Sequence, residues 1–155
     1  MDHPRVRQVV EVLREKGAAG EVRMLPDSAR TAAEAAAALD VEVGQIANSL
    51  VFDADGQAVL VLTSGAHRVD TARVAADHDL PPLTRATPDF VRTHTGQAIG
   101  GISPVGHPAP LRTLVDRALA DFDEVWAAAG HPHAVFPTTY EELLELTGGT
   151  PADVG

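Results

Sequence analysis

The chain has 155 residues, of which 45% are hydrophobic, and it contains no cysteine. This length fits a single domain over residues 1–155, and the apolar content is sufficient to bury a core without covalent cross-links. The absence of cysteine excludes thiol catalysis, thiolate metal sites and disulfides, so the fold is indifferent to its redox compartment.

The charge is strongly acidic, with 22 Asp and Glu against 12 Lys and Arg, which gives a formal net charge of −10. Binding along a nucleic-acid backbone needs a basic stripe, so we expect no DNA partner and only local contact with a polyanion. No apolar run reaches the roughly 18 residues of a membrane span. We therefore expect a soluble cytoplasmic protein that does not bind membranes and whose ligand occupies a pocket.

The first third of the chain predicts two helices and a short strand. Apolar residues recur at helical spacing over residues 4–16, and residues 21–25 are typical of a strand. Thr31 and Glu34 form a capping-box signature ahead of an alanine-rich helix that ends near Asp40.

The middle of the chain predicts a β-hairpin followed by two short helices. Residues 46–52 and 58–63 are rich in β-branched and apolar residues and flank the turn-forming sequence at 53–56. Helices are expected over residues 71–76 and 89–93, after the capping residues Asp70 and Thr87.

The last third predicts three strands, at residues 111–115, 125–129 and 134–136, and a helix capped by Thr139. Strands and helices intermingle without a regular βαβ period, which favours an α+β domain with a mixed β-barrel or sheet flanked by helices. We expect residues 150–155 to form a frayed tail.

The segment 99–107, Ile-Gly-Gly-Ile-Ser-Pro-Val-Gly-His, is the strongest candidate for an active site. Glycines leave main-chain N–H groups unshielded, so such a segment can hold an anionic or carbonyl oxygen. A glycine pair also occurs in ordinary tight turns and bulges. Ser103, Pro104 and the kinked Gly106-His107-Pro108 add more constraint than a simple connection requires.

A family resemblance rests on this segment together with others that occur in the same order. They are Arg30–Ala36, Gln45–Phe52, Ile99–Gly106, Val115-Asp116, Val125–Gly130 and Glu141–Gly148. In this combination the chain resembles the YbaK/ProX family of aminoacyl-tRNA editing domains over roughly residues 20 to 150.

The resemblance implies a compact mixed β-barrel flanked by helices, and a reaction. Family members hydrolyse the ester between a wrong amino acid and the terminal ribose of a tRNA, usually a product of prolyl-tRNA synthetase. The expected partners are the 3′ CCA end of an aminoacyl-tRNA and that synthetase, and no cofactor is expected. The acidic charge predicts weak affinity for tRNA alone.

Ester hydrolysis needs an oxyanion stabiliser and a placed nucleophile more than a strong base. Exposed amides at Gly100, Gly101 and Ile102 fit the first need, and we assign them with Asn48 to the catalytic site. By the resemblance, Thr31, Ser49 and Asp116 lie near the pocket, although the first two also suit a helix cap and a strand hydroxyl. The other expected substrate-binding residues are Ser103, Pro104, Gly106, His107 and His133.

Asn48 departs from the family pattern, in which most relatives carry a lysine that contacts the 3′-terminal nucleotide. Asparagine can donate a hydrogen bond but brings no positive charge. Three outcomes remain open: a changed substrate, compensation by an arginine such as Arg30 or Arg68, or loss of deacylase activity.

Two alternatives to a deacylase remain. One is a silent aminoacyl-tRNA or nucleotide-binding module that kept the pocket and lost the lysine. The other is a metal-dependent hydrolase built on some of the seven histidines, such as His94, His107, His131 and His133. No motif or acidic cluster completes a metal site, so we expect no metal.

Overall fold

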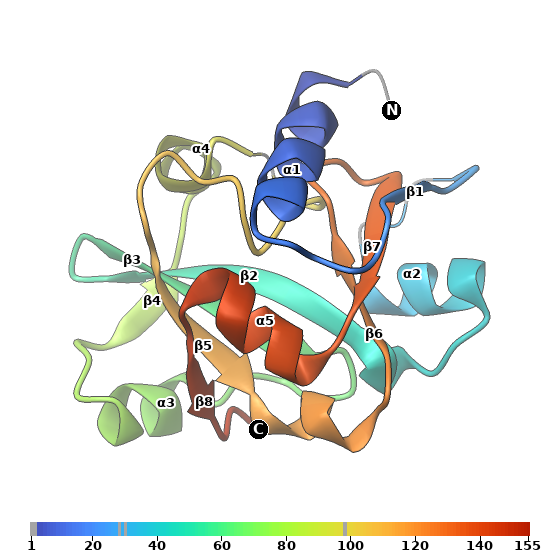
Figure 1. The fold of residues 1–155 in the computed structure, drawn as a ribbon. Coiled ribbons are helices and arrows are strands. Elements are labelled where there is room, and N and C mark those ends of the chain that lie inside the picture. Colours follow the sequence, from blue (N-terminus) through green and yellow to red (C-terminus); the bar gives the residue numbers. More distant parts are fainter. Residues whose placement is uncertain (1–2, 28, 30, 98) are drawn as a thin grey trace.

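The computed structural model describes residues 3–27, 29, 31–97 and 99–155 (Figure 1). Its eight strands form one mixed sheet in the order β1-β7-β6-β2-β3-β5-β8, with β4 paired to β2 beside this path. Helices pack around the sheet, which confirms the predicted α+β class with a mixed sheet flanked by helices.

The strands are bounded as follows: β1 Arg23–Met24, β2 Ile46–Ala54, β3 Gln57–Ser64, β4 Leu83–Arg85, β5 Arg112–Asp116, β6 Val125–Ala128, β7 Ala134–Thr138 and β8 Thr150–Ala152. The helices are α1 Pro4–Glu15, α2 Ala32–Leu39, α3 Thr71–Asp77, α4 Pro88–Thr95 and α5 Tyr140–Thr147, with short 3₁₀ turns at Val43–Gln45 and Arg117–Asp121.

Local signals in the sequence explain most of these boundaries. Thr31 and Glu34 form the expected capping box of α2, and Asp70, Thr87 and Thr139 cap α3, α4 and α5 through their side chains. The β2–β3 hairpin turns through Asp55 and Gly56, both of which have positive φ. A two-residue turn needs positive φ at both positions if its twist is to match that of the flanking strands.

The main core lies between one face of the sheet, α1, α4, α5 and the loop after Ile99. It includes Val6, Leu60, Leu62, Ile102 and Phe136, all buried. A second cluster packs α3 on the other face of β3 and β5, and a third packs α2 on β6 and β7. Helix α2 and the loop after Ile99 therefore approach the β2–β6 junction from different sides.

The prediction that residues 150–155 form a frayed tail is wrong. Residues 150–152 form β8, which pairs in parallel with β5, and both Ala152 and Val154 are fully buried. The main-chain N–H of Asp70 donates to the Val154 carbonyl at 2.6 Å. Pairing with a distant strand and burial of two apolar side chains order this segment, although it carries no strong local signal.

Candidate functional site

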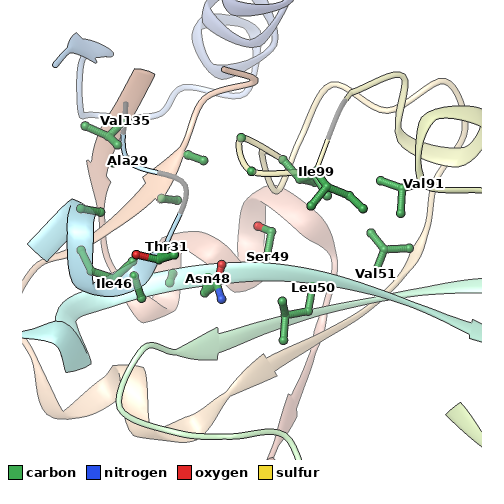
Figure 2. A pocket seen from close by; sticks show the side chains of 18 of the residues that line it. Ala29, Thr31, Ile46, Asn48, Ser49, Leu50, Val51, Val91, Ile99 and Val135 are labelled. Carbon is green, nitrogen blue, oxygen red and sulfur yellow. The ribbon is translucent and has the colours of Figure 1, made fainter. Parts of the chain in front are cut away.

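A cavity of about 330 Å³ opens where β2 passes beneath the loop after α4 (Figure 2). Its walls come from four parts of the chain: residues 46–52 of β2, the beginning of α2, the loop 99–102, and the segment from Arg85 to Val91. Trp126, Ala127 and Ala128 of β6 and Val135 of β7 complete the lining. This volume lies within the range of about 300–1,000 Å³ typical of small-molecule sites.

The glycine loop forms one wall because it packs closely against the turn between β6 and β7. A side chain at Gly101 would place its Cβ 2.6 Å from the His131 carbonyl carbon, and the Gly130 N–H donates to the Gly101 carbonyl at 2.9 Å. Gly100 adopts a φ of 102°, which disfavours other residues. The amides of Gly100, Gly101 and Ile102 donate to no other described residue.

Gln97 holds this loop in shape and was missed by the sequence reasoning. Its side chain is fully buried, its Oε1 accepts from the Ser103 N–H at 2.6 Å, and its Nε2 donates to the Val105 carbonyl at 3.2 Å. A buried glutamine that bridges two main-chain groups fixes the loop conformation. A single glutamine between Gly96 and the glycine pair gives no pattern by which it could have been found.

Ser49 faces the glycine loop from β2. Its side chain points to the side on which Ile99 lies, as does that of Val51, whereas Leu50 points the other way (Figure 2). The Ser49 Oγ is buried and has no hydrogen-bond partner in the described part of the chain, and the same is true of the Trp126 Nε1. Buried polar atoms are nearly always satisfied in folded proteins, so two unsatisfied atoms on different strands of one cavity lining indicate a polar ligand.

Thr31 and Asn48, two further candidate residues, also line the cavity. The Thr31 hydroxyl already caps α2, because it accepts from the Glu34 N–H at 3.1 Å. The Asn48 side chain is half-buried and makes no hydrogen bond to another described residue. The structure therefore brings together five predicted residues besides Thr31: Asn48, Ser49, Gly100, Gly101 and Ile102.

Four other predicted residues lie on the far side of the glycine loop. Ser103 is fully buried and its Oγ accepts from the Val105 N–H at 3.2 Å. Pro104, Gly106 and His107 line a separate depression of about 250 Å³. The His107 Nε2 donates to the Ser103 carbonyl at 2.8 Å, and burial lowers the pKa of His107 below its usual 6.5 despite this hydrogen bond.

His133 and Asp116 are not in the cavity lining either. The His133 Nδ1 donates to the Leu25 carbonyl at 3.1 Å. Asp116 is buried at the end of β5, where its Oδ2 accepts from the Ser64 N–H at 2.9 Å and from the His67 Nδ1 at 2.9 Å. The side chains of both residues are thus engaged in holding neighbouring segments of the fold.

Arg85 is the single charged side chain among the described residues of the cavity lining. It lies on β4, which the sequence reasoning did not predict, and it is exposed at the end of the cavity next to Phe52. Of the two arginines considered earlier as a replacement for the family lysine, Arg68 does not line the cavity and Arg30 lies outside the described residues.

Over the described ranges, no three His, Asp or Glu side chains lie close enough together to hold a metal ion. The His131 ring makes tilted contacts with the rings of His3 and His133, at centroid distances of 4.7 and 5.3 Å. None of the helices in the described part of the chain has the length and apolar character of a membrane span.

The profile of the aminoacyl-tRNA editing domain family matches residues 26–146. The chain belongs to this family. The crystal structure of a proposed trans-editing enzyme for prolyl tRNA synthetase superimposes on this editing domain with a TM-score of 0.92 and 46% identity, covering 99% of this chain and 98% of that one.

Relatives of the editing domain are of two sizes. Protein YwhH of Bacillus subtilis (strain 168), an uncharacterized protein, is 27% identical over 128 residues, which are 82% of this chain and 81% of YwhH. Proline–tRNA ligase of Lysinibacillus sphaericus (strain C3-41) is 31% identical over 94 residues, 61% of this chain but only 16% of the ligase. These similarities give no support to the alternative of a silent binding module that has lost the family lysine.

Proposed function

We propose that this editing domain hydrolyses, in trans, the ester of a mischarged tRNA, with tRNA(Pro) carrying a wrong amino acid as the substrate. The observation that carries the proposal is one cavity whose lining holds both the buried Ser49 Oγ and the main-chain amides of Gly100, Gly101 and Ile102, none of which has a hydrogen-bond partner among the described residues. The ligand that fits must bring oxygen atoms to both walls. An aminoacyl ester on a ribose does so.

In the proposed reaction, water adds to the ester carbonyl carbon and negative charge develops on the carbonyl oxygen. The amides of Gly100–Ile102 stabilise that charge as an oxyanion hole. The tetrahedral intermediate then collapses, the bond between the carbonyl carbon and the ribose oxygen breaks, and the ribose oxygen takes up the proton that the attacking water gives up. The described lining of the cavity contains no His, Asp or Glu, so a positioned ribose hydroxyl is the nearest group to relay that proton.

Arg85 takes over the phosphate contact that the family pattern gives to a lysine at the position of Asn48. Asn48 and Arg85 lie at opposite ends of the cavity, with Asn48 next to the β2–β6 junction and Arg85 on β4. A guanidinium binds phosphate oxygens in a forked geometry. The positive charge that binds a phosphate of the CCA end is thereby supplied from β4 instead of β2.

The protein's net charge of −10 limits its affinity for tRNA outside this contact. We propose that the protein acts in the cytoplasm and that a synthetase, prolyl-tRNA synthetase first among the candidates, delivers the mischarged tRNA. A tethered delivery raises the effective concentration of the CCA end without any new contact.

The test is release of free amino acid from a panel of mischarged tRNA(Pro) species under single-turnover conditions. We expect at least one species to be hydrolysed faster than in the absence of protein, and correctly charged prolyl-tRNA(Pro) to be spared. If folded protein accelerates no member of the panel, the proposal is wrong.

A further inference from the structure

The sheet has a gap beside β2 within the cavity. On the edge away from β3, β2 pairs with β6 only at Ile46 and Ala47, and with β4 only from Phe52 to Ala54. In the described part of the chain, no strand pairs with residues 48–51 on that edge. All four of these residues line the cavity, so the gap opens into it.

The register of the hairpin fixes which main-chain groups face the gap. The Gly65 N–H donates to the Ile46 carbonyl at 2.8 Å, so the even-numbered residues of β2 direct their main-chain N–H and C=O groups towards β3. The Thr84 hydroxyl donates to the Asp53 carbonyl at 3.0 Å, so odd-numbered residues face the other edge. The Ser49 carbonyl and the Val51 N–H therefore lie next to each other on the open edge, as an acceptor beside a donor.

The surroundings of this pair favour a neutral, flat ligand. Apolar side chains line the cavity near it, among them Val51, Ala86, Val91 and Ile102. No Asp or Glu belongs to the described lining, so no carboxylate lies beside this main-chain pair to favour a cationic group over a neutral one. An aromatic base with a donor next to an acceptor satisfies both main-chain groups and fits between apolar walls.

We propose that this gap reads the Watson–Crick edge of the terminal adenine of the tRNA. The adenine N6 amino group donates to the Ser49 carbonyl, and the Val51 N–H donates to the adenine N1. Hypoxanthine and guanine carry an oxygen at position 6 and a hydrogen on N1. Their O6 would face the Ser49 carbonyl, acceptor against acceptor, and their N1–H would face the Val51 N–H, donor against donor. This inference rests on the proposed function, because it identifies the base attached to the hydrolysed ester.

The test uses three non-hydrolysable analogues that differ only in the base. They are 3′-alanylamino-3′-deoxyadenosine, its N6,N6-dimethyl form and its hypoxanthine counterpart. Binding is followed by the fluorescence of Trp126, the single tryptophan, which lines the cavity. We expect the adenine compound to bind at least about tenfold more tightly than either of the others, since each lost pairing leaves buried polar groups unsatisfied. Equal binding of the three, or no binding of the adenine compound, overturns the inference.

Two variants test the main-chain groups themselves. Val51→Pro removes an N–H that the β2–β3 ladder does not use, and we expect it to lose the preference for adenine over hypoxanthine. The control Ser49→Ala removes the hydroxyl and keeps the main chain, so it retains the preference. A retained preference in folded Val51→Pro contradicts the inference, and if that variant does not fold, the analogue series with the unmodified protein decides.

Failure of this inference is distinguishable from failure of the proposed function. Equal deacylation of mischarged tRNAs ending in adenosine and in inosine overturns base reading and leaves the deacylase intact. Preference for the adenine analogue without release of amino acid from any mischarged tRNA overturns the deacylase and leaves base reading intact.

Discussion

Two polar regions of this editing domain differ in how their buried atoms are satisfied. Around Asp116, the carboxylate accepts from the main chain of Ser64 and Ala118 and from the side chains of Thr63 and His67. In the cavity, by contrast, the Ser49 Oγ and the Trp126 Nε1 are buried without a partner among the described residues, and none of the described strands pairs with residues 48–51 on one edge of β2.

This difference separates a structural cluster from a binding site. A buried polar group without a partner costs about 1–3 kcal/mol, and a fold retains such groups where a ligand satisfies them. The carboxylate of Asp116 has its partners within the chain and ties β3, β5 and the segment after β3 together. We therefore expect changes near Asp116 to lower stability and changes in the cavity to lower activity.

The largest effect is expected for Gly101→Ala. The added Cβ would lie 2.6–2.8 Å from main-chain atoms of His131 and Pro132, so the loop must move away from the ester. Loss of one oxyanion-hole donor lowers the rate by about 10²–10³-fold in enzymes, and we expect a loss of that order in kcat/KM for deacylation.

Gly20→Ala is the matched control for this variant. Its Cβ meets the Pro137 carbonyl at least as closely, but Gly20 does not line the cavity. Both variants should have a lower free energy of unfolding, while only Gly101→Ala should lose kcat/KM when rates are expressed per folded molecule. Equal losses of activity would mean that the glycine loop has no direct role.

The next largest effect is expected on the stability of the region around Asp116. Asp116→Ala leaves the Ser64 and Ala118 amides without their acceptor, and we expect the free energy of unfolding to fall by about 3 kcal/mol in denaturant titration. The control Asp153→Ala removes a half-exposed carboxylate that pairs with Arg117 at 2.9 Å, and should cost less than about 1 kcal/mol. Loss of activity in Asp116→Ala without loss of stability would contradict the distinction between the two regions.

A smaller effect is expected for Arg85→Ala. If Arg85 binds a phosphate of the CCA end, KM for mischarged tRNA should rise about fivefold, and the dependence of log KM on log salt should weaken by about one phosphate contact. Arg68→Ala removes an exposed arginine that does not line the cavity and serves as the control. An identical salt dependence in both variants would exclude Arg85 as the anchor.

The smallest effect is a change of stability with pH. Because burial lowers the pKa of His107 below 6.5, the unfolded chain binds more protons than the folded one between that lowered pKa and 6.5. The contribution of His107 to stability is therefore complete above pH 6.5 and declines as the pH falls through this window. Thermal unfolding at several pH values should show a shallower decline for His107→Gln than for the unmodified protein. A parallel decline would mean that His107 is not the group responsible.

The sequence predicts those elements whose boundaries are set by neighbouring residues. The capping residues Thr31 and Asp70 and the turn at Asp55-Gly56 act within a few positions of themselves, so their helices and hairpin were predicted correctly. Strands β4 and β8 have only three residues each and owe their order to pairing with β2 and β5, which no local pattern reveals.

The same limit applies to the cavity. The glycine loop was identified as a candidate from its residue types and Ser49 from the family resemblance, and the structure brings them together in one cavity lining. The sequence could not show that the Ser103 side chain is buried in the core, or that Asp116 binds the main chain of Ser64 at the end of β5. Nor could it show that Arg85 reaches the cavity from β4. Each of these outcomes depends on which face of a strand or loop a side chain occupies.

We infer that the unsatisfied buried polar groups mark where the substrate binds. The most direct measurement is a ¹H–¹⁵N correlation spectrum recorded while 3′-alanylamino-3′-deoxyadenosine is added. We predict shifts at the amides of Ser49, Val51, Gly100, Gly101 and Ile102, and none at Ser64 and Ala118, whose amides already bind Asp116. Shifts centred on Asp116 and His67, or none in the cavity, would contradict the account.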